Sequence, residues 1–175
     1  MLDYRQCNLR PMTPQDLDMV LMWRNHPKIR QHMLTQHHIS HEEHALWFEK
    51  SAANLQRKIM LIECNGVAFG LVHFNGIEKN ACTEWGFYLS PDAPKGSGTS
   101  LGTSALSFAF NALQLHKVCG QVLDSNHASI RFHERFGFKL EGRLREQVPI
   151  SSEFQDLLCF GLLKTEWSQH AVDKG

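Results

Sequence analysis

The most constraining feature of the sequence is a glycine-rich turn between a segment typical of a strand and a longer segment typical of a helix. Residues 82–90 form the strand-like segment, a loop with two prolines and a glycine covers 91–97, and apolar residues at helical spacing run over about 98–115. The N–H groups in the first turn of a helix lack partners within it, and the helix dipole adds positive potential there. The pattern is typical of a seat for a pyrophosphate, although a flexible loop that caps a helix fits it about as well.

Strands dominate the rest of the chain. The dipeptide Asn65-Gly66 supplies the positive φ angles of a two-residue hairpin turn, so the segments on either side of it are expected to pair antiparallel. Two strands near the end of the chain are also expected to be antiparallel neighbours. The strands besides 82–90 are predicted at residues 58–64, 67–75, 117–123, 138–148 and 154–163.

Helix signals mark the first third of the chain and one later segment. Thr13-Pro14 starts a helix that Pro27 ends, and Ser40 begins a capping box that opens a second helix. An extended, histidine-rich stretch lies between the two, and Asn126 opens a short helix further on. With the strands, this pattern predicts an α/β (α+β) fold with a mixed, mostly antiparallel sheet of about six to seven strands and helices on both faces.

Composition and charge narrow the class of protein. A chain of 175 residues fits one domain over residues 1–175 and can bury a core without disulfides or metal. Lys+Arg and Asp+Glu balance at 18 each, which argues against a protein that binds nucleic acid by neutralising phosphates. No apolar run approaches the ~20 residues of a spanning helix, and the first residues lack the apolar core of a secretory signal. We therefore expect a cytoplasmic protein that binds neither nucleic acid nor membranes.

The cysteines and histidines show no metal-binding pattern. The cysteines are odd in number, form no CxxC or Cys/His zinc spacing, and are interpreted as small buried hydrophobes in a reduced protein. Histidines cluster between residues 26 and 44, where His41 and His44 could share a helix face, but no third ligand is specified, so we expect no metal site. The cysteines are Cys7, Cys64, Cys82, Cys119 and Cys159.

Two segments together resemble a known family. The first is Lys95-x-x-Gly98-x-Ser100 in the glycine-rich turn, and the second is a strand, then Asn126, then a helix that ends in Gly-Phe. Both resemble motifs of the GNAT superfamily of N-acetyltransferases, although Lys95 and Ser100 depart from the family's usual Arg/Gln-x-x-Gly-x-Gly/Ala. The resemblance implies a GNAT fold and direct transfer of acetyl from acetyl-CoA to an amine, without a metal.

The resemblance covers about residues 5–165 and implies where acetyl-CoA would bind. Its pyrophosphate would lie on backbone N–H groups of the glycine-rich turn, and its pantetheine arm would pair with the end of the preceding strand. Asn126 would contact the cofactor as well. The implied cofactor-binding residues are Phe87, Tyr88, Leu89, Lys95, Gly96, Ser97, Gly98, Thr99, Ser100 and Asn126.

Two residues are candidates for the proton transfers that accompany acetyl transfer, although much of the rate can come from positioning alone. Glu84 lies on the strand that enters the turn, where related enzymes often place a base, so we expect it to act through water; the alternative is a surface carboxylate. His133 stands where related enzymes usually carry a tyrosine that protonates the leaving thiolate. It is either the acid, with an unperturbed pKa of about 6.5, or an ordinary helix residue.

The acceptor is expected to bind along residues 23–48. The Arg-Asn-His-Pro run at 24–27, a later methionine and a histidine in the next helix resemble the acetyltransferases of pseudaminic acid biosynthesis. Those enzymes, linked to flagellin glycosylation, acetylate a UDP-linked 4-amino-4,6-dideoxy sugar. Leu34 and Gly76 depart from the aromatic and basic contacts expected in them, and Gln121 replaces a carboxylate. The implied substrate-binding residues are Arg24, Met33, His44, Trp47, Asn75 and Tyr88.

Other functions stay open beside the nucleotide-sugar acceptor. Some later features recur in the RimJ/RimL-like branch of the superfamily, which acetylates protein N-termini and small amines. An antibiotic or polyamine acetyltransferase should show a cluster of carboxylates at the acceptor, where residues 24–48 offer Glu42 and Glu43. An inactive module that binds acyl-CoA is a third alternative. The final two strands could also pair in a homodimer.

Overall fold

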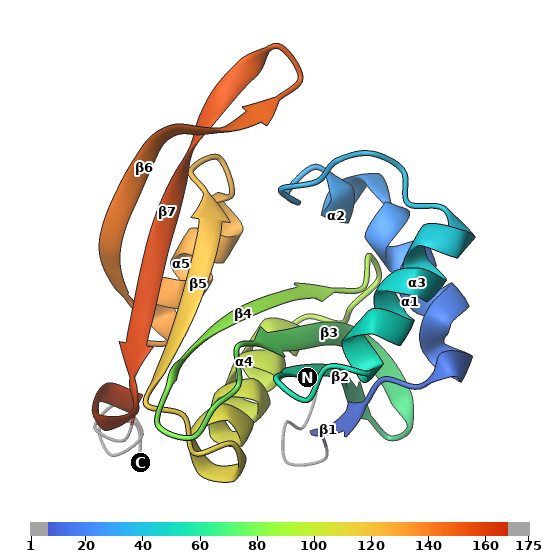
Figure 1. Ribbon diagram of the computed structural model, residues 1–175, viewed down its shortest axis with the longest axis horizontal. Helices are drawn as coiled ribbons and strands as arrows, with labels where there is room; N and C mark the ends of the chain where they lie inside the picture. Colours follow the sequence, from blue (N-terminus) through green and yellow to red (C-terminus); the bar gives the residue numbers. More distant parts are fainter. Residues whose placement is uncertain (1–6, 168–175) are drawn as a thin grey trace.

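A seven-stranded mixed sheet forms the frame of the protein. The computed structural model describes residues 7–167, so the ends of the expected 1–175 domain lie outside the described residues. The strand order is β1-β2-β3-β4-β5-β7-β6, and each neighbouring pair is antiparallel except β4 and β5 (Figure 1). The predicted α/β class with a mostly antiparallel sheet is confirmed. The strands are β1 (Cys7–Pro11), β2 (Arg57–Cys64), β3 (Val67–Asn75), β4 (Cys82–Leu89), β5 (Lys117–Leu123), β6 (Lys139–Ile150) and β7 (Glu153–Leu163).

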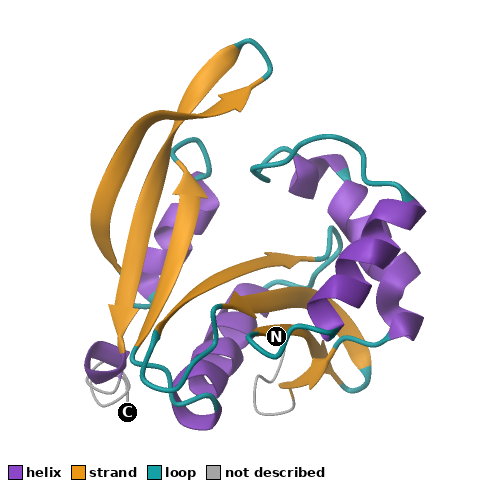
Figure 2. Cartoon of the chain, in the orientation of Figure 1, coloured by secondary structure: helices purple, strands orange, loops and turns teal. Residues whose placement is uncertain are grey.

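Helices cover both faces of this sheet (Figures 1 and 2). α1 and α3 pack on one face of β2 and β3, α2 packs against α1, and α4 and α5 pack on the opposite face of the sheet. Within the described residues, none of the helices is long and apolar enough to span a membrane. The helices are α1 (Leu17–Asn25), α2 (Pro27–Arg30), α3 (His41–Ala52), α4 (Ser97–Ser107) and α5 (His127–Arg135), with a 3-10 turn η2 (Pro14–Asp16) before α1 and a π-helical turn η3 (Phe108–Ala112) after α4.

The apolar core divides along these two faces. The larger part lies between the sheet and α4 and α5, where Phe74, Leu106 and Phe110 are almost fully buried. The smaller part, under α1 and α3, centres on Val20 and Leu61. Burying a side chain of this size contributes roughly 1.5–3 kcal/mol each, so both faces of β2 and β3 are tied firmly to their helices.

Local turn chemistry behaves as the sequence predicts. Asn65 and Gly66 both have positive φ angles, 53° and 78°, and they connect β2 to β3 as a tight hairpin. The side chain of Asn126 caps α5 by accepting a hydrogen bond from the backbone N–H of Ser129 at 3.1 Å. Gly137 follows α5 with a φ of 85°.

The β2–β3 pairing contains a bulge close to its hairpin. Glu63 pairs with Ala68 but Ile62 pairs with Gly70, so Phe69 is an extra residue in β3. A bulge residue is left out of the ladder, so the residues of β3 beyond it pair with β2 one position later than they would in a regular ladder. From Gly70 onward, this places Leu71 toward α1 and α3 and brings Asn75 opposite Arg57.

The parallel pairing of β4 with β5 is short and ends abruptly. It runs from Cys82 opposite Lys117 to Trp85 opposite Gly120, and the two strands then diverge (Figure 1). Gly120 leaves room for two rings at this point, since an added Cβ would lie 2.6 Å from Nε2 of His133 and 2.8 Å from Nε1 of Trp85. The divergence opens the sheet at its centre.

Three details differ from the sequence-based expectations. β1 was not predicted, because its apolar–polar alternation covers only five residues and pairing with β2 stabilises it. Pro27 begins the short helix α2 instead of an extended stretch, and the ring of His26 accepts a hydrogen bond from the backbone of Lys28. The helix predicted over about 98–115 changes to π-helical geometry at Phe108.

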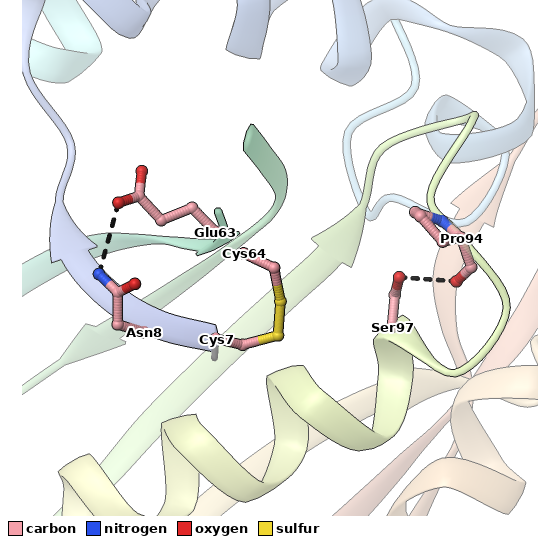
Figure 3. The surroundings of a disulfide bond; sticks show 6 residues. All are labelled: Cys7, Asn8, Glu63, Cys64, Pro94 and Ser97. Atoms are coloured by element: carbon pink, nitrogen blue, oxygen red, sulfur yellow. Dashed lines mark hydrogen bonds between the residues drawn. A yellow bond between two sulfur atoms is a disulfide. The ribbon is translucent and has the colours of Figure 1, made fainter. Parts of the chain in front are cut away.

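A disulfide joins Cys7 to Cys64, so the expectation that all the cysteines are reduced is wrong for these two (Figure 3). The two residues face one another directly in the β1–β2 register, although 57 positions separate them in sequence. Sequence spacing gave no sign of this pair, because the proximity arises only when β1 adds to the edge of the sheet. Cys82, Cys119 and Cys159 are free thiols.

The disulfide between Cys7 and Cys64 is expected to contribute measurably to the free energy of unfolding. Thiol titration of denatured protein prepared without reductant should find three reactive cysteines, and reduction should lower the free energy of unfolding by roughly 2–4 kcal/mol, since the bond closes a long loop. The double substitution Cys7→Ser/Cys64→Ser should reproduce the effect of reduction, with Cys82→Ser as control. Five reactive thiols before reduction would contradict the pairing.

Candidate active site

A pocket of about 480 Å³ opens where β4 and β5 diverge and extends between the sheet and α3. It brings together both expected catalytic residues and all the expected substrate-binding residues. Leu89 and the glycine-rich turn do not line it. Within residues 7–167, no group of three His, Cys, Asp or Glu side chains is arranged to hold a metal ion. The expected site residues that line the pocket are Arg24, Met33, His44, Trp47, Asn75, Glu84, Phe87, Tyr88, Asn126 and His133.

Arg24 presents a buried, unpaired N–H group to this pocket. Its Nη2 donates to the backbone carbonyl of Thr35 at 2.6 Å, whereas its Nη1 is buried without a hydrogen-bond partner. Burial lowers the pKa of the guanidinium, and the nearby phenol of Tyr88 acts in the opposite direction. A guanidinium remains charged despite such a shift, so a positive charge faces the pocket.

His44 lies beside Arg24 at the same end of the pocket. Its ring is buried, stacks on Trp47 with centroids 5.0 Å apart, and hydrogen-bonds to the backbone carbonyl of Leu17. Nε2 has no partner, so it is free to contact a ligand. Burial lowers the pKa of His44, and an anion placed beside Nε2 would act against that shift.

Three polar side chains that face the pocket from β2 and β3 were only partly foreseen. Asn75 was expected, but Arg57 and His73 were not. The Asn75 amide lies 3.3 Å from Nδ1 of His73, whose ring covers Gly86 of β4 so closely that a Cβ there would be 2.4 Å from Nε2. Burial, with Arg57 as a lesser cause, lowers the pKa of His73 to about 4, so the ring is neutral at pH 7. Only the strand register could have revealed this cluster.

Glu84 lies at the mouth of the pocket on β4. It pairs with Asn75 of β3 on one side and with Cys119 of β5 on the other, in the last stretch before the strands diverge. Its side chain is exposed, so water can reach the carboxylate. The position fits a base that acts through water, which stays a prediction.

His133 is the site residue whose geometry departs most from the expected proton donor. The indole N–H of Trp85 donates to Nε2 at 3.2 Å, so Nε2 must be the unprotonated nitrogen. Nδ1 then donates to the backbone carbonyl of Ser129 at 2.8 Å. Burial lowers the pKa of His133 to about 4. Both nitrogens are engaged and the ring is neutral, which fits the alternative of an ordinary helix residue better than a proton donor.

The glycine-rich turn lies at the start of α4, outside the lining of the pocket. Gly96 has a φ of 96°, which only glycine adopts readily. The backbone N–H groups of Ser97, Thr99 and Ser100 bond to carbonyls within the turn, whereas those of Gly96 and Gly98 have no such partner among the described residues. The hydroxyl of Ser97 also donates to Pro94. The donors available to an anion are therefore fewer than expected.

A cation near this turn was missed by the sequence analysis. The Nη2 atom of Arg135, on α5, would lie 3.8 Å from a Cβ on Gly98, and its guanidinium also lies over the rings of Phe132 and Phe136. This adds positive charge beside the free N–H of Gly98. The turn thus combines backbone donors, a helix start and a cation, which fits a phosphate-bearing cosubstrate.

This fold and site define the class of protein. Residues 6–139 match the family model of the acetyltransferase (GNAT) domain, so the chain belongs to the GNAT family. It is an acetyl-CoA-dependent N-acetyltransferase.

Named relatives differ in the acceptor that their names indicate. The chain is 29% identical over 133 residues to acetyltransferase PseH of Campylobacter jejuni, covering 76% of this chain and 83% of that one. It is 24% identical over 154 residues to spermidine N(1)-acetyltransferase of Escherichia coli, covering 86% and 82%. The solved structure of spermidine N-acetyltransferase from Vibrio cholerae, with CoA and spermine, superimposes with a TM-score of 0.87 at 24% identity, over 94% of this chain and 99% of that one.

The buried state of His133 predicts a pH-dependent stability. Its pKa of about 4 in the folded protein lies below the ordinary value of about 6.5, so the unfolded chain binds the extra proton first as pH falls. The free energy of unfolding should therefore be fully maintained above pH 6.5 and fall by about 1.4 kcal/mol per pH unit toward pH 4, with His73 adding a similar slope.

Denaturant unfolding at pH 7, 6 and 5 checks this expectation. His133→Gln should remove one of the two contributions and flatten the dependence, with His116→Gln, which replaces an exposed histidine, as the control. The same slope in His133→Gln and in the unsubstituted protein would contradict a neutral, buried His133.

Proposed function

We propose that this enzyme transfers acetyl from acetyl-CoA to the 4-amino group of a UDP-linked 4-amino-4,6-dideoxy sugar, as the pseudaminic acid pathway requires. The observation that carries the proposal is the unpartnered, buried Nη1 of Arg24, with the free Nε2 of His44 at the same end of the pocket. A positive charge in a partly dehydrated pocket favours an anionic acceptor and disfavours a polycation. A nucleotide-sugar carries its charge on phosphates remote from the reacting amine.

The rest of the pocket supports an acceptor with a flat base and a sugar. Trp47 and Met33 offer apolar surface near Arg24, as a nucleobase would need. The sequence resemblance to acetyltransferases of pseudaminic acid biosynthesis supports the same anionic acceptor as the positive charge of Arg24 does. Self-association through the exposed edge strand β6 is a separate proposal, consistent with the dodecameric structure of the Vibrio cholerae spermidine enzyme.

Acetyl-CoA supplies a thioester whose carbonyl accepts the amine. We infer that its pyrophosphate lies on the turn at Gly96 and Gly98 and that its pantetheine arm enters between β4 and β5 beside Phe87. The chain's own residues then position the two reactants, and Glu84 accepts the proton of the amine through water. The nitrogens of His133 are committed to Trp85 and Ser129, so the leaving thiolate takes its proton from solvent.

A polyamine acceptor is the second candidate, because the spermidine acetyltransferases are similar in fold and length. The pocket offers the carboxylates of Glu43 and Glu84 to such a substrate. Arg24 and Arg57 line the same pocket, and Glu43 already pairs with His37, which favours the anionic acceptor.

Coenzyme A release with different acceptors tests the proposal. UDP-4-amino-4,6-dideoxy-N-acetyl-altrosamine should give rapid, acceptor-dependent release from acetyl-CoA, and spermidine or an N-terminal peptide should give little above the blank. Release with spermidine alone would replace the proposed acceptor. Tight binding of acetyl-CoA without release to any amine would indicate an inactive acyl-CoA-binding module.

Replacement of Glu84 tests its role as base. Glu84→Gln should lower kcat by about 10²–10⁴-fold while the KM for both substrates changes little, since the amide keeps the shape but cannot accept the proton. Glu42→Gln, an exposed neighbour of the pocket that does not line it, is the matched control. An unchanged kcat in Glu84→Gln would make Glu84 a surface carboxylate.

A further inference from the structure

A second cation, Arg57 at the start of β2, lines the acceptor pocket near the ring of Trp47. Arg57 is half-buried, its Nε is buried without a hydrogen-bond partner, and its Cζ lies 5.6 Å from the centroid of the Trp47 ring. It pairs with Asn75 across the β2–β3 ladder, and both side chains line the pocket. Nothing in the sequence analysis assigned it a role.

No carboxylate neutralises Arg57 within the part of the chain that the structure describes. The ion pairs there involve other residues, and burial lowers the pKa of the Arg57 guanidinium with no opposing acid. Leaving a charged donor buried and unpaired costs free energy that a folded protein rarely accepts without a use for the group. A ligand with negative charge would relieve that cost.

Asn75 lies beside Arg57 and is able to present either a donor or an acceptor. Its Oδ1 is buried without a partner, and its amide contacts Nδ1 of His73, whose role depends on the tautomer. If the Asn75 amide turns over and His73 exchanges its tautomer, the contact survives and an N–H of Asn75 faces the pocket next to Arg57. The pair can then offer two donors to one anion.

We propose that Arg57, with Asn75 beside it, forms a second anion-binding subsite, which takes one phosphate of a diphosphate whose other phosphate binds Arg24 and His44. This rests on the proposed function and deepens it. Two separate cationic positions fit two linked anionic groups better than a single carboxylate or monophosphate. The Trp47 ring connects the two positions, since it contacts both His44 and Arg57.

Calorimetric binding of UDP and of UMP to the full-length enzyme tests the proposal. Saturating CoA is kept present so that neither probe binds at the turn before α4. Arg57→Met and Arg24→Met should each weaken UDP binding on the order of ten- to hundredfold, as expected for loss of a charged hydrogen bond. For UMP, which has one phosphate, only one of the two substitutions should have this effect.

Lys58→Met is the matched control, because it removes the same charge from the next residue of β2, which is exposed and does not line the pocket. The affinity for CoA shows whether each variant is folded. If Arg57→Met does not fold, Arg57→Gln takes its place in the experiment. Equal effects of Arg57→Met and Lys58→Met on UDP would overturn the proposal. Equal losses of UDP and UMP in both arginine variants would indicate one shared anion site and would also overturn it.

The failure of the proposed function would look different. In that case the enzyme and the Lys58→Met control would both bind CoA but neither UDP nor UMP. This result would rule out the nucleotide-sugar acceptor, and the ligand of this subsite with it. By contrast, UDP binding that Arg57→Met leaves unchanged would retain the acceptor and remove only the role of Arg57.

Discussion

The rest of the structure depends on where the parallel pairing of β4 and β5 ends. Trp85 and Gly120 are the last paired residues, and the hydrogen bond from the Trp85 indole to His133 ties β4 to α5 at that point. Beyond it the strands separate and the pocket begins. The aromatic rings around His133, including Phe138 and Phe160, keep this junction rigid because none of them can move without disturbing the core.

The acceptor side of the pocket has a different physical character from this apolar junction. Three strands present Arg57, Asn75 and Glu84 in one row, with the neutral ring of His73 behind them. Arg24 and His44 approach the same space from helices on the other side. Among residues 7–167, the buried side-chain N and O atoms without a hydrogen-bond partner all belong to this group: they are those of Arg24, His44, Arg57 and Asn75. This contrast is typical of a surface shaped for a ligand and not for stability alone.

Much of this architecture could be predicted from the sequence because it depends on local signals. The Asn65-Gly66 turn, the Asn126 cap and the extent of β3 all follow from short-range chemistry, and the GNAT motifs indicated the cosubstrate. Arg57, His73 and the disulfide could not be predicted, because their neighbours are set by strand pairing between distant segments. His133 lines the pocket, but only its partners in the folded protein show that both nitrogens are occupied.

The bulge at Phe69 has a consequence for how enzymes of this kind can change their acceptor. If β3 paired regularly from Ala68 onward and Phe69 took a place in the ladder, Arg57 would stand opposite Phe74, and side chains that now fill the core would replace the polar row. A one-residue shift of register, begun far from the reacting centre, would thus exchange the chemistry of an entire wall of the pocket. Acceptor preference can therefore diverge through the loss or gain of a bulge in the β2–β3 pairing, with every residue that handles the acetyl group left as it is.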